Sequence, residues 1–418
     1  MVADARPAIG YVTSRYPLIS HTFVQREVIG LREAGYDIET FSVVQTGEDQ
    51  ILSPTDRAEA DRTAFIRPAG VGKLLRHLGR PALRNVGAAL ALVRLAGRRW
   101  WADPRQLLWR LFYVAEAIML WSLAADRGVT HLHAQHANVA ANVSWLAAEF
   151  GRRVGDGPRT WSFTMHGSTE FLDVERHDLG AKAAAASRVA CISDFTRSQL
   201  MMVTEPDAWD RFDVVHCGVD PDRFVPDPPE RSADEFTVLF VGRLGAEKGL
   251  PLIVDALGRL QATVAPMRVR FLVVGDGPLR GDVAERCAAL GVDVEFAGAV
   301  GQHEIARYYH RADAFCMASF REGIPVVLME AMACEIPCVA PHITAIPELI
   351  EEGVTGLTAT AGRADEIADR LERYATDPDF AVGVGKAGRE KVLAEFTTAD
   401  TIAGMAAFFD RVRAREEQ

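Results

Sequence analysis

The sequence has no run of 18 or more apolar residues, the length that a helix needs to cross a bilayer. The apolar stretch at 111–125 is interrupted by Glu116, and the stretch at 86–93 ends at Arg94. The first residues also lack the apolar segment of a secretory signal peptide. We therefore expect a cytoplasmic protein that does not span a membrane, although it could lie at the inner face of the cell membrane.

Paired cysteines and an excess of positive charge are missing as well. None of the six cysteines forms a Cys-x-x-Cys pair, so we expect reduced, buried thiols and neither a disulfide framework nor a metal site. The 46 Lys and Arg residues stand against 57 Asp and Glu residues, which gives a net charge of −11. This balance disfavours nucleic acid as a partner, because nucleic-acid-binding domains are usually basic.

The sequence does contain two series of short apolar segments that alternate with helical ones. A chain of 418 residues is longer than the roughly 250–300 at which one core stops growing, so two domains are expected. The alternation predicts an α/β fold with parallel sheets. We predict strands at 8–13, 37–44, 129–133, 160–165, 188–192 and 212–216, then at 237–241, 269–274, 292–297, 314–318 and 337–340. We predict helices at 23–34, 250–260, 304–311 and 326–333.

A proline-rich, acidic segment at 218–234 is the clearest linker. It separates a predicted N-terminal domain at 1–217 from a C-terminal domain at 235–396, with a closing helix at 397–418. Within the first domain, residues 67–110 are helix-like and carry ten basic residues against one acid, Asp103, with three tryptophans interleaved. Two interpretations stay open: a surface that contacts an anionic membrane, or a helical insertion with solvated arginines and tryptophans in the core.

Two glycine-bearing turns follow predicted strands of the second domain. Gly242-Arg243-Leu-Gly-Ala-Glu-Lys248 leads into a helix, an arrangement that suits a phosphate because helix N–H groups and two cations favour an anion. Gly275-Asp-Gly-Pro resembles a dinucleotide fingerprint, but Gly281 comes one position too late. Glu295 lies about 20 residues downstream, where a dehydrogenase places its ribose-binding acid, and this keeps a dehydrogenase as a minor alternative.

A pair of glutamates is the most informative feature. Glu322 and Glu330 are eight positions apart, the first before a predicted helix and the second inside it among Met329, Ala331 and Met332. A carboxylate in so apolar a helix is costly unless it is paired or faces a polar ligand. Two such carboxylates could accept hydrogen bonds from the hydroxyls of a sugar and a ribose.

The first domain supplies two further candidates. His166 follows a predicted strand and precedes a glycine, so its tunable charge could act on a reacting sugar or an acceptor hydroxyl, although a structural histidine is the commoner case. Ser20 and His21 lie in the loop before the first helix and could face the acceptor, unless this loop only caps that helix.

Together these motifs resemble glycosyltransferase family 4. The resemblance rests on the Glu322–Glu330 spacing, Arg243 and Lys248, Gly275-Asp-Gly-Pro, and Val215-His-Cys-Gly-Val-Asp-Pro-Asp-Arg-Phe. The segments 16–24 and 131–136 look more loosely like the bacterial exopolysaccharide branch, of colanic-acid type. Two departures stand out: Glu335 and the pair Thr344-Ala345 occupy positions where the family usually has glycine.

The resemblance implies a GT-B fold, in which two facing Rossmann-like domains border a central cleft, and a retaining, metal-independent sugar transfer from a UDP- or GDP-type donor. It implies that Arg243 and Lys248 neutralise the diphosphate, and that His166 is the cleft histidine. Glu322, Gly323 and Ile324 would contact the donor sugar, and Val326 and Val327 would contact the phosphate. Glu330 would bind the ribose, and the loop with Gly298 and Val300 would contact the base.

The acceptor stays open: a sugar, a lipid-linked or a small-molecule hydroxyl in polysaccharide, glycolipid or natural-product biosynthesis. Two other functions fit the same architecture, a sugar-nucleotide epimerase and a non-catalytic nucleotide-sugar sensor. No cofactor is expected, since the nucleotide sugar is a substrate.

Overall fold

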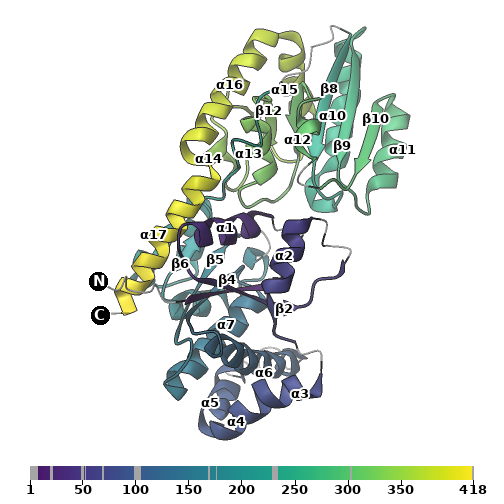
Figure 1. Ribbon diagram of the computed structural model, residues 1–418. Coiled ribbons are helices and arrows are strands. Elements are labelled where there is room, and N and C mark those ends of the chain that lie inside the picture. The colour runs from purple at the N-terminus through teal and green to yellow at the C-terminus, as the bar shows by residue number, and fades with distance from the viewer. Residues whose placement is uncertain are drawn as a thin grey trace. The chain divides into compact units, whose positions relative to one another are not determined.

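The chain folds into two compact units, Met1–Val215 with Ile402–Gln418 (unit 1), and His216–Thr401 (unit 2). The computed structural model describes residues 8–18, 22–48, 51, 53–67, 70–97, 105–167, 170–175, 177–227, 234–301 and 304–416. Each unit carries its own parallel sheet (Figure 1).

The described part of unit 1 is built on a seven-stranded sheet in the order β3-β2-β1-β4-β5-β6-β7. Its strands are β1 (Ala8–Arg15), β2 (Ile38–Val44), β3 (Ala64–Phe65), β4 (Val129–Gln135), β5 (Thr160–Met165), β6 (Val189–Cys191) and β7 (Phe212–Val214). All neighbours pair in parallel. The central strands are buried along nearly their whole length, as expected for a sheet covered on both faces.

Helices cover both faces of this sheet. They are α1 (Thr22–Glu33), α2 (Pro54–Arg62), α7 (Val139–Val154), α8 (Leu179–Ala185), α9 (Asp194–Met202) and α17 (Thr398–Glu416). On one face α17 packs with α1: Phe408 and Phe409 join Tyr11 and Val28 in one apolar cluster. On the other face lies α7, which starts where the Asn138 side chain accepts a hydrogen bond from the Ala140 N–H.

The segment between β3 and β4 forms a helical insertion that packs on α7 (Figure 1). It comprises α3 (Val71–Leu74), a π-helical turn (Leu75–Gly79), α4 (Arg80–Arg84), α5 (Val86–Gly97) and α6 (Arg105–Ala125). Trp100 and Trp101 lie outside the described residues. The described part of the insertion is therefore mainly helical.

The helix α6 qualifies the expectation drawn from apolar run lengths. Its window Leu108–Ala125 is long and apolar enough to cross a membrane, by length and composition alone. However, 44% of that window is buried inside the unit, where Ile118, Leu120 and Trp121 join the core. Glu116 in its middle bonds to Arg67 at 2.8 Å. The part of α6 from Val114 onward therefore packs in the core of unit 1, whereas Leu108, Trp109 and Phe112 are exposed.

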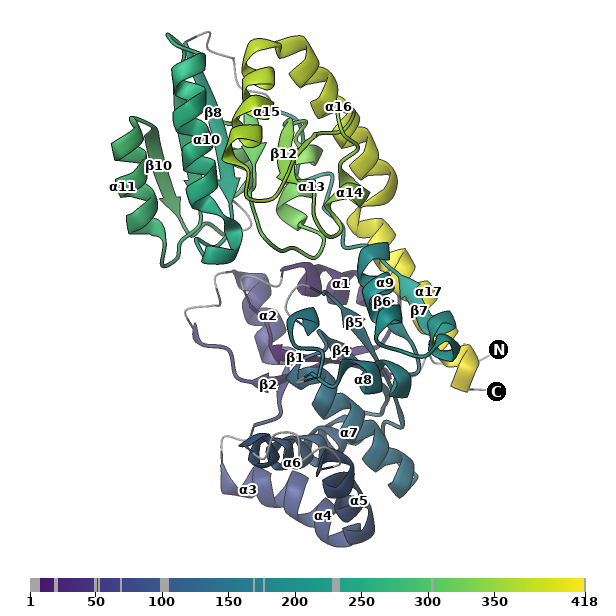
Figure 2. The same cartoon turned by 180° about the vertical axis from the view of Figure 1, so that it is seen from behind.

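Unit 2 repeats the same topology in its described residues, with a six-stranded parallel sheet in the order β10-β9-β8-β11-β12-β13. Its strands are β8 (Glu235–Val241), β9 (Arg268–Val274), β10 (Asp293–Gly298), β11 (Ala314–Cys316), β12 (Cys338–Pro341) and β13 (Leu357–Ala359). Its helices are α10 (Leu250–Thr263), α11 (Arg280–Leu290), α12 (Ala306–Tyr309), α13 (Val326–Ala333), α14 (Ile346–Leu349), α15 (Ala364–Thr376) and α16 (Pro378–Glu395). Figure 2 shows β10 and α11 at one edge of this unit, and α10 packs on α15.

In both sheets the strand order reverses direction once, between β1 and β4 in unit 1 and between β8 and β11 in unit 2. Ligands of open α/β sheets bind beyond the carboxyl ends of the strands at such a switch point. The loops that leave these four strands are therefore the places where a site is expected.

Candidate active site

Three loops of unit 2 meet at the carboxyl ends of β9, β8 and β11. The loop after β8 bonds to its neighbours through its backbone, from the Leu244 N–H to the Asp276 carbonyl at 3.0 Å and from the Phe320 N–H to the Glu247 carbonyl at 2.9 Å. A Cβ added to Gly249 would lie 2.1 Å from the Ala318 carbonyl oxygen, and one on Gly275 would lie 2.0 Å from the Gly242 oxygen. Glycine is needed at both positions because backbones approach closely there.

The two predicted phosphate-binding cations lie on this loop, and each is paired with a carboxylate. The Lys248 ammonium donates to Glu322 Oε1 at 2.7 Å, which brings the end of β8 and the segment before α13 together at the switch point. Arg243 donates to Glu247 at 2.7 Å. Burial raises the pKa of Glu247, but hydrogen bonds from its own backbone and from Arg243 lower it by a larger amount. The pKa of Glu247 is therefore below its usual value.

These two ion pairs differ in exposure. The side chains of Lys248 and Glu322 are 23% and 11% exposed, whereas those of Arg243 and Glu247 are 66% and 32% exposed. An exposed pair is worth about 0–1 kcal/mol, so an incoming anion could detach Arg243 easily. The sequence indicated both cations but not Glu247, because only the turn of this loop brings the Glu247 carboxylate to Arg243.

The helix α13 starts beside this pair. Pro325 is the N-cap residue of α13 and provides no side-chain hydrogen bond, so the first N–H groups of the helix, at Val326 and Val327, are without a capping side chain. Gly323 and Ile324 connect Glu322 to this helix, and Ile324 is buried. An uncapped helix start of this kind attracts an anion.

Glu330 lies inside α13 and is 1% exposed. The Tyr309 hydroxyl donates to its Oε2 at 2.8 Å, and burial together with this carboxylate raises the pKa of Tyr309 well above its usual value. The structure thus gives the buried carboxylate a partner, as its apolar setting requires. Nothing in the sequence singled out Tyr309, because it is 21 positions away on another helix.

Gly298 and Val300, which are predicted to contact the base, lie at the end of β10 and in the loop that follows it. The Gly275 N–H donates to the Gly298 carbonyl at 2.8 Å, and Val300 follows in a partly buried position. Glu295, by contrast, bonds to both Arg270 and Arg311 within the sheet edge. The residue that kept a dehydrogenase in consideration is thus already engaged in a structural ion-pair network.

Two of the three residues that stand where the family usually has glycine adopt left-handed backbone conformations, with φ of 59° at Glu335 and 47° at Thr344, whereas Ala345 has a φ of −93°. The left-handed conformation is unusual for a β-branched residue such as threonine, and it follows β12 at the carboxyl edge of the sheet. The Thr344 hydroxyl is also buried without a hydrogen-bond partner. The departure at Thr344 therefore carries backbone strain close to the loops described above.

In unit 1, His166 follows β5 directly. Its ring stacks on His136, with centroids 4.3 Å apart, and lies 5.0 Å from the Phe23 ring. Its Nε2 bonds to the Gln135 side-chain oxygen at 2.8 Å. Because an amide oxygen only accepts, this bond places a proton on Nε2.

Gln135 is itself oriented by a buried carboxylate. Its amide nitrogen donates to Glu27 Oε1 at 2.9 Å, and the Tyr11 hydroxyl donates to the same oxygen at 2.8 Å. Burial raises the pKa of Glu27 to about 7, and the two hydrogen bonds act in the opposite direction. The chain Tyr11–Glu27–Gln135–His166 escaped sequence reasoning, because its members come from β1, α1, β4 and the loop after β5.

Lys182 of α8 makes a hydrogen bond to the loop that carries His136. This lysine is fully buried, and its ammonium donates to the Ala137 carbonyl at 2.6 Å. Burial lowers the pKa of Lys182 to about 7. Ser20 and His21, predicted to lie on the acceptor side, are outside the described residues.

The chain is similar in sequence and in fold to known proteins. A family model described as "Glycosyl transferases group 1" matches residues 235–377. The chain is 27% identical over 403 residues to the putative colanic acid biosynthesis glycosyltransferase WcaL of Escherichia coli K12, which covers 93% of this chain and 96% of that protein. It is 30% identical over 297 residues to the GDP-mannose-dependent alpha-(1-6)-phosphatidylinositol monomannoside mannosyltransferase of Mycobacterium tuberculosis, covering 67% of this chain and 72% of that protein.

Among solved structures, HepE of Anabaena in complex with UDP-glucose superposes with a TM-score of 0.72 at 16% identity, covering 97% of this chain and 100% of that one. This likeness confirms the predicted GT-B fold. The comparisons lend no support to an epimerase or a sensor. The chain therefore belongs to the group 1 glycosyl transferases, the family that its motifs resemble, and it is a glycosyltransferase.

Proposed function

We propose that this glycosyltransferase moves a sugar, with retention of anomeric configuration, from a nucleotide-diphosphate donor bound on unit 2 to a hydroxyl acceptor. The observation that carries the proposal is the Lys248–Glu322 pair at the switch point between β8 and β11. It puts a cation, a carboxylate and an uncapped helix start together where a nucleotide is expected.

Each group would have a distinct task. Arg243 and Lys248 would bind the diphosphate and stabilise the negative charge that develops as it leaves, a task that a divalent metal performs in other enzymes. We therefore expect transfer without an added metal ion. The N–H groups of Val326 and Val327 would hold a phosphate oxygen, and Glu322 with Gly323 and Ile324 would hold sugar hydroxyls.

Glu330 would bind the ribose hydroxyls, either after its carboxylate turns away from Tyr309 or while it still accepts the hydrogen bond from the Tyr309 hydroxyl. The loop with Gly298 and Val300 would contact the base. The mycobacterial relative is named for GDP-mannose, whereas HepE was solved with UDP-glucose, so both bases remain candidates for this chain. In unit 1, His166 with its Nε2 proton held by Gln135 would contact a sugar or acceptor hydroxyl.

A thermal-shift screen tests the donor. The purified protein is melted with a panel of UDP- and GDP-sugars, with and without EDTA, because a ligand that binds only the native state raises Tm. We expect a shift with one base that EDTA does not reduce. A shift that disappears with EDTA would contradict the metal-independent site, and no shift with any donor would contradict the proposed donor site.

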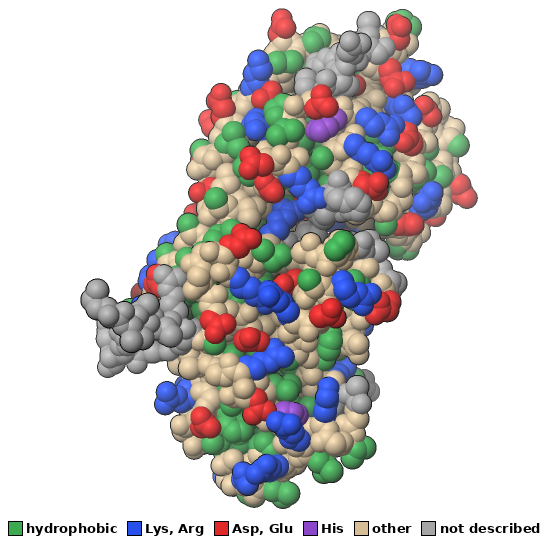
Figure 3. Space-filling model, in the orientation of Figure 1, with side chains coloured by type: hydrophobic (Ala, Val, Ile, Leu, Met, Phe, Trp, Pro, Cys, Tyr) green, Lys and Arg blue, Asp and Glu red, His purple; other side chains and the backbone are tan. Residues whose placement is uncertain are grey.

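We further propose that the helical insertion contacts an anionic membrane, which would favour a lipid-linked acceptor. The described stretch 70–97 contains no acidic residue. It exposes several cations, Lys73, Arg76, Arg80, Arg84 and Arg94. It also exposes large apolar side chains, with Leu83 79% and Leu75 63% exposed. Figure 3 shows Lys and Arg beside hydrophobic side chains at this end of the unit.

Such a mixture suits a lipid surface, where each cation near anionic headgroups contributes about 1 kcal/mol and apolar groups enter the interface. We expect co-sedimentation with vesicles of phosphatidylglycerol and phosphatidylethanolamine, and weaker binding by R84E than by wild type. R259E, which reverses an exposed arginine of α10, is the matched control. Equal binding by the two variants, or none by the wild type, would contradict this contact.

A further inference from the structure

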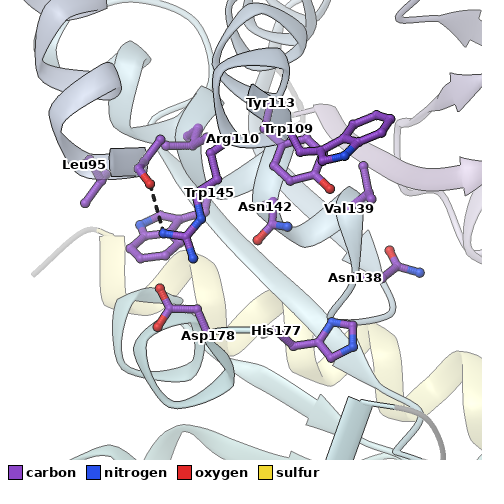
Figure 4. A pocket seen from close by; sticks show the side chains of 12 residues that line it. Leu95, Trp109, Arg110, Tyr113, Asn138, Val139, Asn142, Trp145, His177 and Asp178 are labelled. Carbon is purple, nitrogen blue, oxygen red and sulfur yellow. Dashed lines mark hydrogen bonds between the residues drawn. The ribbon is translucent and has the colours of Figure 1, made fainter. Parts of the chain in front are cut away.

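A pocket of about 520 Å³ lies within unit 1, between the helical insertion, α7 and the segment before α8 (Figure 4). This volume is within the ~300–1,000 Å³ range of small-molecule sites. In Figure 4, Trp109 and Tyr113 line it from α6 and Asn142 from α7, with His177 and Asp178 on the opposite side. None of these residues belongs to the donor site proposed above.

The walls of this pocket are held in place. The Trp145 ring stacks on Trp161 with an interplanar angle of 16°, and Trp161 is 1% exposed. The Arg110 guanidinium, drawn with a dashed line in Figure 4, donates to the Ala96 carbonyl at 3.2 Å. A ligand would therefore meet a lining that needs little ordering on binding.

One polar group in the lining lacks a partner. The side-chain amide of Asn142 makes no hydrogen bond with any residue that the structure describes, although its side chain projects among the other lining groups in Figure 4. An amide offers both donors and an acceptor to a ligand. Trp109 presents an indole that is 57% exposed, next to this amide in the same lining.

Aromatic rings beside amide, carboxylate and imidazole groups form a surface that matches a saccharide. The C–H face of a pyranose packs on an aromatic ring, while its hydroxyls exchange hydrogen bonds with planar polar groups. A purely aliphatic ligand would cover the Asn142 amide without offering it a hydrogen bond, which is costly. The lining therefore favours a sugar over a lipid chain.

The pocket also lies close in the chain to the histidine pair. Asn138 lines it and follows His136, whose ring stacks on His166, with only Ala137 between them. The buried Lys182 fixes this connection through the Ala137 carbonyl. A ligand that occupies the pocket and extends along 136–138 would reach the edge of unit 1 where His166 lies.

We propose that this pocket binds a sugar residue of an oligosaccharide acceptor, remote from the hydroxyl that receives the new sugar. The inference rests on the proposed function, since it assigns the pocket to the acceptor of that transfer. Binding energy from such a remote residue would position the reactive hydroxyl and favour longer acceptors over short ones.

The test uses the full-length protein on an array of gluco-, galacto- and manno-oligosaccharides of two to six residues and of bacterial exopolysaccharide fragments. The dissociation constant of the best binder is then measured by titration calorimetry. We expect W109A and N142A each to weaken binding by at least tenfold. W209A removes another exposed tryptophan of unit 1, 40% exposed and outside the pocket, and should bind like the wild type.

Unchanged affinity in both pocket variants, or no array binding at millimolar concentration, would overturn the proposal. Binding of dodecyl maltoside without binding of maltose or longer glucans would overturn it in favour of a lipid. Melting curves establish that each variant is folded; Trp109 is exposed, so W109A keeps the proposal testable if N142A does not fold. A failed donor screen would count against the proposed transfer alone, because the array needs no nucleotide sugar.

Discussion

Replacing Lys248 by methionine tests the chemistry assigned to unit 2. Methionine keeps most of the apolar stem but removes the charge that bonds to Glu322 at 2.7 Å. Two unit charges about 4 Å apart interact by about 4 kcal/mol at the effective dielectric of a protein surface. Removing one preorganised group that stabilises developing charge lowers kcat by about 10²–10³-fold. We expect a loss of this size in K248M.

The stability of K248M should change much less. Glu322, 11% exposed, loses its partner, and an unpaired polar group costs about 1–3 kcal/mol. That loss corresponds to a decrease in Tm of about 2–12 °C for a unit of this size. The assay follows nucleotide release at saturating donor, alongside a melting curve. K386M, at an exposed lysine of α16, is the matched control.

A folded K248M that keeps kcat within threefold of the wild type would refute the assigned phosphate chemistry. The double variant K248M/E322Q adds a second criterion. If Glu322 only positions Lys248, the double variant should be no slower than K248M. If Glu322 also holds a sugar hydroxyl, as proposed, the double variant should be slower than either single variant.

Two further predictions concern stability. Burial raises the pKa of Glu27 from 4.5 to about 7, so between these values the native protein holds a proton that the unfolded chain has released, and the free energy of unfolding falls as pH rises through this window. The Tm of E27Q relative to wild type should therefore increase from about pH 5 to about pH 8 in calorimetry, and a difference independent of pH would contradict this assignment. Thr344 has a φ of 47° and a buried hydroxyl without a partner, so T344G should raise Tm by relieving strain of about 1–2 kcal/mol, partly offset by the added backbone freedom of the unfolded chain. A lower Tm would show that the threonine side chain makes up for its strained backbone.

Much of the fold could be predicted because a parallel sheet between helix layers has a plain sequence signature. Segments 160–165 and 269–274 are rich in aromatic, β-branched and other apolar residues, and the structure has β5 and β9 there. Helices α15 and α16 escaped prediction. α16 contains Gly383, Gly385 and Gly388, which weaken its helical pattern. Gly385 is needed for packing, since a Cβ there would lie 2.1 Å from the Glu335 carbonyl oxygen.

The candidate site divides in a similar way. Arg243, Lys248, Glu322 and Glu330 could be found because their charges stand in glycine-rich or apolar segments. Their partners could not, since a contact such as the one between Lys248 and Glu322 joins positions 74 apart in the chain. Only the strand order, which places β8 beside β11, brings these two segments together.

That pairing also resolves an apparent conflict in the proposed site. A lysine already bonded to a carboxylate would be a poor ligand for a diphosphate if that contact used all of its hydrogen-bond donors. The ammonium has three donors, and Glu322 Oε1 takes one of them. Two donors are left for phosphate oxygens, and Oε2 is left for a sugar hydroxyl. Glu322 would therefore hold the cation in position before the donor arrives and link the leaving group to the sugar once it is bound.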